Sequence, residues 1–122
     1  MLGSNLFRML TAVHPKLPMR NPAATQQYYV QQLGFALLSD YGDYLILEKD
    51  QVEIHFFLHK TLVPEENDGQ VYIRVQPIEA LYTAWQAAGV HIHTALAVKP
   101  WGQWEFSLLD PDHNLLTFGQ AV

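Results

Sequence analysis

The chain has 122 residues, a net charge of −5 and no cysteine. This length suits one domain of ordinary size, and the lack of cysteine excludes a disulfide framework, a thiolate metal site and a cysteine nucleophile. Only 7 Lys and Arg stand against 12 Asp and Glu, without a basic run, which argues against a nucleic-acid partner. No apolar stretch approaches the roughly 20 residues that cross a bilayer. The first residues also lack the pattern of a signal peptide, so we expect a cytoplasmic protein with no membrane partner.

The first half of the sequence predicts an extended segment, a helix and a meander of strands. Residues 12–20 contain two prolines, which favours an irregular or edge strand. Asn21 and Pro22 are typical of a helix start, and Gly34 suits the left-handed residue after a helix end, so we expect a helix over 22–33. Three extended runs follow, over 35–38, 44–48 and 52–58.

The second half repeats this order after a polar loop over 60–70. Alternating apolar residues predict a strand over 71–75. A helix follows over 78–88, with Trp85 on its apolar stripe and therefore in the core, and Gly89 ends it. Three more extended pieces are predicted around 91–98, 105–109 and 114–118.

This repetition predicts an α+β fold built from two βαβββ modules. The modules cover about 10–60 and 70–120 and together form a single domain over 1–122. A four-stranded sheet cannot bury both faces alone, so one face is expected to pack on its helix. The other face curves into a trough that faces either the second module or a partner chain.

Several short motifs occur together, in one order, from about residue 12 to the end of the chain. They are Leu17-Pro18-Met19-Arg20-Asn21, Leu33-Gly34-Phe35, Ala88-Gly89-Val90, Pro100-Trp101-Gly102 and Leu109-Asp110-Pro111-Asp112-His113-Asn114. In order and spacing they resemble the vicinal oxygen chelate superfamily, which holds glyoxalase I, extradiol dioxygenases, fosfomycin resistance enzymes and bleomycin-binding proteins. Within it, Phe56-Phe57-Leu58-His59 and the Glu105-Phe106 pair after the Pro-Trp-Gly motif resemble bleomycin resistance proteins.

That resemblance implies non-catalytic sequestration of a flat, cationic, bleomycin-like antibiotic by a homodimer with domain-swapped or interlocked subunits. The drug grooves would lie at the dimer interface. By position, Trp101 and Tyr44 would stack on the planar rings of the drug, although Trp101 could equally pack the subunit contact. Further candidates for the lining of the groove are Trp104, His55, Phe57, His59, Arg74 and Glu105. The acidic balance of the chain suits a cationic ligand.

The resemblance also implies an alternative, a metal-dependent lyase, isomerase or dioxygenase of the glyoxalase type. Enzymes of this superfamily hold a divalent metal at two positions in each half, which correspond here to His14, His55, Gln70 and Thr117. Threonine is a poor ligand for a divalent ion, which argues against this reading. His14, His55 and Gln70 could still form an open site for Zn, Ni, Fe or Mn. We favour no metal and no catalysis; a third reading is a dimerisation module with a vestigial trough.

The acidic residues give no independent sign of acid–base catalysis. Asp110 and Asp112 flank Pro111, which is typical of a turn. Glu53 and Glu105 each precede an apolar strand residue, and we expect both side chains to face solvent or to form ion pairs.

Overall fold

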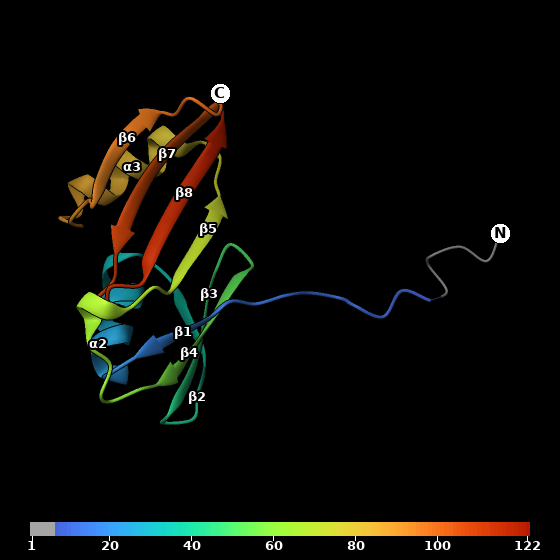
Figure 1. Cartoon of the computed structure of the whole chain (residues 1–122), viewed down its shortest axis with the longest axis vertical. Coiled ribbons are helices and arrows are strands. Elements are labelled where there is room, and N and C mark those ends of the chain that lie inside the picture. The colour runs from blue at the N-terminus through green and yellow to red at the C-terminus, as the bar shows by residue number, and fades with distance from the viewer. Residues whose placement is uncertain (1–6) are drawn as a thin grey trace.

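The computed structural model describes residues 7–122, which form two four-stranded sheets with helices packed beside them (Figure 1). The first sheet has the spatial order β1 (Lys16–Met19), β4 (Val52–Leu58), β3 (Tyr44–Lys49), β2 (Ala36–Asp40). The second has the order β5 (Gln70–Arg74), β8 (Leu115–Ala121), β7 (Gln103–Leu109), β6 (Thr94–Val98). In each sheet the first strand pairs in parallel and the other neighbours are antiparallel. The predicted α+β fold with two βαβββ modules is confirmed.

The first helical segment has the predicted extent but not the predicted regularity. It starts as α2 (Pro22–Gln26) and continues as the π-helix η1 (Gln27–Gln32). The Asn21 side chain caps its start by accepting hydrogen bonds from the amides of Ala23 and Ala24, at 2.9 and 3.3 Å. Gly34 ends it with a φ of 85°. Apolar spacing over so short a segment cannot distinguish a helix with i→i−4 bonds from one with i→i−5 bonds, so the sequence did not indicate this change.

The second helix, α3 (Ile78–Ala87), is regular, and its apolar stripe enters the core as predicted. Trp85 is buried, and its ring lies 5.1 Å from that of Phe118 and 6.1 Å from that of Phe106. On β4, Ile54 and Phe56 are fully buried. Because side chains alternate across a strand, the residues between and beside these two lie on the opposite face of the sheet.

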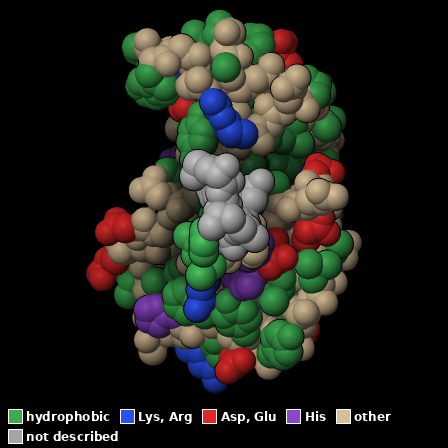
Figure 2. Space-filling model, turned by 90° about the vertical axis from the view of Figure 1, so that its right-hand side faces the viewer, with side chains coloured by type: hydrophobic (Ala, Val, Ile, Leu, Met, Phe, Trp, Pro, Cys, Tyr) green, Lys and Arg blue, Asp and Glu red, His purple; other side chains and the backbone are tan. Residues whose placement is uncertain are grey.

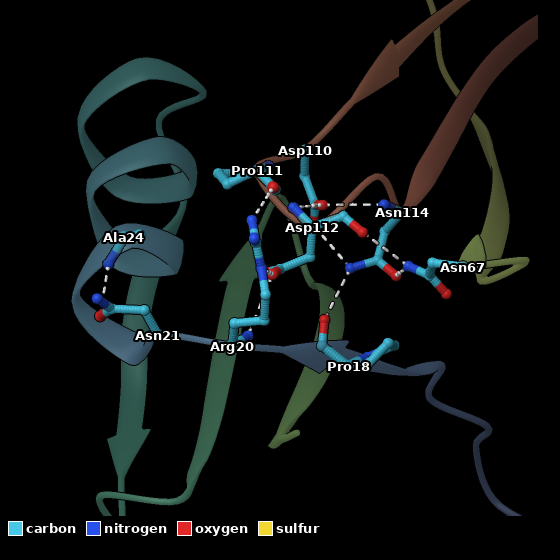
Figure 3. Close-up of polar contacts among 9 residues, drawn as sticks. All are labelled: Pro18, Arg20, Asn21, Ala24, Asn67, Asp110, Pro111, Asp112 and Asn114. Carbon is cyan, nitrogen blue, oxygen red and sulfur yellow. Dashed lines mark hydrogen bonds and ion pairs between the residues drawn. The ribbon is translucent and has the colours of Figure 1, made fainter. Parts of the chain in front are cut away.

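A partly buried polar network joins the two modules within one chain (Figure 3). The Arg20 guanidinium donates to the Asp112 carboxylate and to the Pro111 carbonyl, each at 2.7 Å. The buried side-chain amide of Asn114 donates to the Pro18 carbonyl at 3.0 Å. Asp110 accepts the backbone amides of Asp112 and Asn114, at 2.8 and 3.0 Å, as expected for a turn. The turn before β8 therefore fixes β1 against the second module.

Residues 14 and 15 lie against β4, and residues 7–13 before them form an extended arm that runs away from both sheets (Figure 1). Four large apolar side chains of this arm are exposed: Phe7, Met9, Leu10 and Val13. The signal-peptide prediction concerns residues 1–6 and so falls outside the described part. Over residues 7–122, no helix has both the length and the apolar character required to cross a bilayer. Between the sheets, the polar linker contains the short 3₁₀ helix η2 (Pro64–Glu66).

Candidate functional site

Each sheet turns one face away from its buried core, and these two open faces carry most of the predicted site residues. The first open face consists of Lys16, Tyr44, Glu53, His55 and Phe57, which alternate with buried residues on β1, β3 and β4. The second open face consists of Tyr72, Arg74, Gln103, Glu105 and Thr117, which alternate in the same way on β5, β7 and β8. In one chain the predicted stacking residue Tyr44 therefore belongs to one sheet, and Trp101, which precedes β7, belongs to the other.

The first open face holds a connected group of imidazoles around one carboxylate. The His55 ring lies 2.6 Å from a Glu53 carboxylate oxygen through Nε2 and 2.7 Å from the Tyr44 hydroxyl through Nδ1. The His14 ring stacks on that of His55, with centroids 5.2 Å apart. His14 Nε2 lies 3.5 Å from the same Glu53 oxygen. The Glu53 carboxylate, which we expected to face solvent or to form an ion pair, thus contacts the imidazoles of both His14 and His55.

This donor set fits a divalent metal ion. One donor atom from each of His14, Glu53 and His55 lies within 4.8 Å of the others. Two imidazoles and a carboxylate are a ligand set typical of zinc and of non-haem iron. The set shares His14 and His55 with the sequence prediction. Gln70, the third predicted ligand, is instead an exposed residue at the start of β5 in the second sheet.

Sequence reasoning missed Glu53 as a potential ligand, although a signal for it was present. Glu53 and His55 are two residues apart on a predicted strand, and residues i and i+2 of a strand lie on the same face. His14 lies next to them because β1 pairs in parallel with β4, with Lys16 opposite His55. The cluster therefore follows from the strand alternation together with a pairing that the sequence alone did not supply.

The second open face holds an aromatic group around a different carboxylate. A Glu105 carboxylate oxygen accepts a hydrogen bond from the Tyr72 hydroxyl at 2.8 Å and another from the Trp101 indole at 3.0 Å. Glu105 is only 8% exposed, whereas Trp101 is 64% exposed. The expectation that Glu105 faces solvent or forms an ion pair is thus wrong. The rings of Tyr72 and Trp101 cover its carboxylate, and both donors are neutral.

The position of Tyr72 depends on Gly119. A Cβ atom at Gly119 would collide with the Tyr72 hydroxyl, so the phenol ring occupies the space that a side chain on β8 would fill. From there the hydroxyl reaches across β8 to Glu105 on β7. Burial of the hydroxyl, followed by its hydrogen bond to Glu105 and the charge of that carboxylate, raises the pKa of Tyr72. Tyr72 therefore stays protonated and remains a donor at neutral pH.

The remaining predicted residues are spread over several surfaces. Arg74 donates a hydrogen bond to the side chain of Gln103 on the second open face. Trp104 is half-buried on the other side of β7, where it packs against the core, so the structure does not bring it beside Trp101. Phe57 lies opposite Tyr44 in the pairing of β3 with β4. His59 is exposed just after β4, and its backbone amide donates to the Met19 carbonyl at 2.7 Å.

A groove of about 580 Å³ lies elsewhere, between α3 and the turn that joins β3 to β4. Its lining is mostly apolar and includes Val52, Ala84 and Trp85. Among the predicted site residues, Arg74 alone reaches it. Trp101, Tyr72 and Glu105 do not line this groove.

Comparison with known proteins identifies the family. Residues 11–118 match the family model of the Glyoxalase/Bleomycin resistance protein/Dioxygenase superfamily. The chain is 26% identical over 125 residues to a bleomycin resistance protein of Geobacillus stearothermophilus, with 88% of this chain and 95% of the relative covered. It is 27% identical over 110 residues to a bleomycin resistance protein of Klebsiella pneumoniae, with 84% and 86% covered.

Solved structures show the same similarity. A bleomycin-binding protein complexed with bleomycin superposes with a TM-score of 0.85 at 26% identity, over 93% of this chain and 100% of that one. A bleomycin-binding protein of Streptomyces verticillus complexed with copper(II)-bleomycin superposes with a TM-score of 0.76 at 22% identity, over 90% and 97%. At 22% identity, the similarity to the Streptomyces verticillus protein shows a shared fold and nothing more. Because the family model spans most of the chain, this protein belongs to the Glyoxalase/Bleomycin resistance protein/Dioxygenase superfamily.

Proposed function

We propose that the protein binds and sequesters a flat, cationic small molecule of the bleomycin class without changing it chemically. The observation that carries this proposal is the Trp101 indole, which is exposed and yet held by a hydrogen bond to the buried Glu105 carboxylate. The similarity to bleomycin resistance proteins and to a bleomycin-binding protein in complex with bleomycin supports the ligand class. We expect this binding to take place in the cytoplasm.

An exposed indole in a fixed orientation suits a stacking platform. Covering its face with a planar ligand removes apolar area from water, and offset stacking adds about 0.5–1.5 kcal/mol for each aromatic pair. The hydrogen bond from the indole to Glu105 restricts the ring before the ligand arrives. Less rotational freedom is then lost on binding, which favours affinity.

The charge around this platform suits a cation. Both hydrogen bonds to Glu105 come from neutral groups, so its negative charge is not neutralised by them. Arg74, the cation on the same open face, is hydrogen-bonded to Gln103. A positive group of a ligand stacked on Trp101 would complement Glu105 in surroundings where water screens the interaction only in part.

We further propose that the functional unit is a homodimer. The arm of residues 7–13 exposes four large apolar side chains and runs away from its own sheets (Figure 1), which suits a contact with a second copy. Interlocked subunits would face the first open face of one protomer toward the second open face of its partner. Tyr44 and Trp101 would then form the two walls of one slot, and the dimer would hold two such slots.

The proposal is tested by titrating the purified protein with metal-free bleomycin while its tryptophan fluorescence is followed. We expect saturable quenching near one drug molecule per subunit, and a dimer mass by light scattering. Trp101→Ala should weaken binding at least tenfold, which corresponds to about 1.4 kcal/mol. Trp104→Phe, on the other side of β7, is the matched control and should bind as the wild type does. A wild-type protein without saturable binding, or an unchanged affinity of Trp101→Ala, would contradict the proposal.

The metal-dependent lyase, isomerase or dioxygenase stays a second candidate, favoured by the cluster of His14, Glu53 and His55. A bound divalent ion would polarise oxygen atoms of a substrate as a Lewis acid. Against it, Thr117 stands where such enzymes carry a carboxylate. No cofactor takes part in the sequestration that we favour. Conversion of bleomycin or of a glyoxalase-type substrate by the metal-loaded protein would decide for this candidate; intact drug recovered from the complex favours sequestration.

A further inference from the structure

We infer that the place taken by the Tyr72 hydroxyl, next to Gly119 and Glu105, is the subsite for a cationic N–H group of the ligand, such as a primary ammonium or a guanidinium. The ligand displaces the phenol ring of Tyr72 and donates to Glu105 instead of it. This inference rests on the proposed function, because it adds a second contact to a ligand that stacks on Trp101. It makes Tyr72 and Gly119 the residues that determine which cations are accepted.

The strand register places this subsite over β8. Gly119 lies opposite Glu105 of β7 on one side and opposite Arg74 of β5 on the other. Arg74 donates to the side chain of Gln103. A cation of the same chain thus lies across β8 from Glu105, and yet a neutral group, the Tyr72 hydroxyl, makes the hydrogen bond to this carboxylate.

One carboxylate oxygen of Glu105 joins the subsite to the stacking platform. The Tyr72 hydroxyl and the Trp101 indole nitrogen lie 2.8 and 3.0 Å from that same oxygen. A donor that replaces the hydroxyl is therefore at most two hydrogen-bond lengths from the indole nitrogen. A planar ring on Trp101 with a short tail that ends in a cation can contact both groups.

The Tyr72 side chain can leave this place at a modest cost. It is 47% exposed, so its ring can turn into solvent, where water satisfies the hydroxyl. A cationic donor adds an attraction between charges that the phenol lacks. Because Glu105 is largely buried, water screens that attraction only in part. Exchange of the hydroxyl for a cation is therefore favoured, whereas exchange for a neutral donor gains little.

Gly119 limits the size of the group that fits. A Cβ atom there would collide with the Tyr72 hydroxyl, and it would equally exclude a ligand donor from the same place. A primary ammonium or one edge of a guanidinium is compact and offers N–H donors. A trimethylammonium group has the same charge, but methyl groups replace its donors and need more room. The subsite therefore distinguishes cations by their N–H groups as well as by their charge.

The wider charge of the molecule acts in the same direction. The chain carries 12 Asp and Glu against 7 Lys and Arg. Figure 2 shows acidic side chains spread over the face from which the arm projects, and Lys and Arg side chains in separate places. The net negative potential attracts a cationic ligand and so favours its arrival.

The test measures, by calorimetry, the binding of three naphthalene probes with a two-carbon tail. The tail ends in a primary ammonium, in a trimethylammonium or in a hydroxyl group. We expect the wild type to bind the ammonium probe about tenfold more tightly than either of the others. Tyr72→Phe removes the competing hydroxyl and should bind the ammonium probe severalfold more tightly than the wild type does. Gly119→Ala should abolish the preference, because its methyl group takes the place of the donor.

These two variants lose the same hydrogen bond of Tyr72, so a merely structural role would change their affinities alike. Opposite changes for the ammonium probe are therefore specific to the subsite. Tyr82→Phe is the matched control, because it removes a phenol hydroxyl from α3, where the Tyr82 ring packs on the buried Phe106. It should bind all three probes as the wild type does. Tyr72→Phe adds no atoms, so it keeps the test valid if Gly119→Ala fails to fold.

Two results would overturn the inference. One is a wild-type protein that binds the ammonium and trimethylammonium probes equally. The other is an affinity for the ammonium probe that Tyr72→Phe leaves unchanged or weakens. In either case, saturable binding of metal-free bleomycin by the wild type leaves the proposed function standing. If the wild type does not bind bleomycin, the proposed function fails and this inference fails with it.

Discussion

The two modules share one topology but carry different chemistry on their open faces. In the first, Lys16 pairs with His55 across β1 and β4, and imidazoles gather around the partly exposed Glu53. At the matching place in the second, Tyr72 pairs with Thr117 across β5 and β8, and aromatic rings enclose the buried Glu105. The inward-facing residues that determine the fold are alike in type. The residues between them, which do not determine the fold, are where the two modules differ in chemistry.

A third region, the junction between the modules, differs from both open faces because its central acceptor, Asp110, is buried and surrounded by donors. Asp110 accepts four hydrogen bonds there, from Tyr29, from two backbone amides and from the side chain of Asn114. An open face retains unpaired capacity for a ligand, whereas the junction uses its capacity to hold the chain together. Substitutions at the junction should therefore affect stability, and substitutions on the open faces should affect binding.

The largest expected effect comes from breaking the junction. Asp110→Ala leaves several buried donors without an acceptor, and each such donor costs about 1–3 kcal/mol. We expect the free energy of unfolding to fall by more than about 3 kcal/mol, measured by urea denaturation. The exposed Asp68→Ala is the control and should change it by less than about 0.5 kcal/mol. A loss for Asp110→Ala as small as that of the control would mean that the modules hold together without this network.

A smaller effect is expected from Gly119→Ala on the second open face. The added methyl group would collide with the Tyr72 hydroxyl, and the half-exposed ring of Tyr72 can swing toward solvent. The cost should then match the loss of one hydrogen bond to a carboxylate, about 1.5–3 kcal/mol. Tyr72→Phe removes the same bond without a clash and should cost the same within error. A much greater loss for Gly119→Ala would show that the ring is confined.

The fold and its modules could be predicted from the sequence because helix ends and strand alternation are local signals. Gly34 and Gly89, which end the two helices, and the alternation around Ile54 and Phe56 were sufficient for that. The burial of Glu105 was not predictable, since its cover comes partly from Tyr72, 33 residues away, and needs the gap at Gly119. The rule that residues i and i+2 of a strand share a face was sufficient to place Glu53 beside His55. That His14 joins them follows from the pairing of β1 with β4, which the sequence did not indicate.

A still smaller effect is expected on binding when only the charge of Glu105 is removed. Glu105→Gln keeps the size of the side chain, and its amide oxygen can accept both hydrogen bonds, because the Tyr72 hydroxyl and the Trp101 indole donate to the same carboxylate oxygen. If the carboxylate attracts a positive group of the drug, affinity for bleomycin should fall severalfold, by about 1 kcal/mol. The matched ligand is a flat, uncharged aromatic probe, whose affinity should not change. Equal losses for both ligands would assign Glu105 to holding the Trp101 ring, and no loss for either would remove it from the site.

The smallest effect is a pH dependence at the junction. Burial raises the pKa of Asp110 above its ordinary value, although hydrogen bonds from Asn114, Tyr29 and the backbone oppose this. A carboxyl whose pKa is higher in the folded than in the unfolded protein binds its proton more tightly when folded. Its contribution to stability is therefore fully present below the unfolded value, near 3.9, and is lost as the pH rises through the folded value.

Comparison with Asp110→Asn isolates this contribution, because every other carboxyl titrates in both proteins and cancels in the difference. The wild type should be the more stable protein at pH 7. In Asp110→Asn an NH₂ group replaces one acceptor oxygen and faces groups that are themselves donors. This advantage should grow as the pH falls from 7 toward 4, measured by urea denaturation at each pH. An advantage that instead shrinks on acidification would mean that the four hydrogen bonds outweigh burial and hold Asp110 ionised. The junction would then depend on a buried carboxylate charge, and in this respect it would resemble the Glu105 group, although Asp110 has more hydrogen-bond partners.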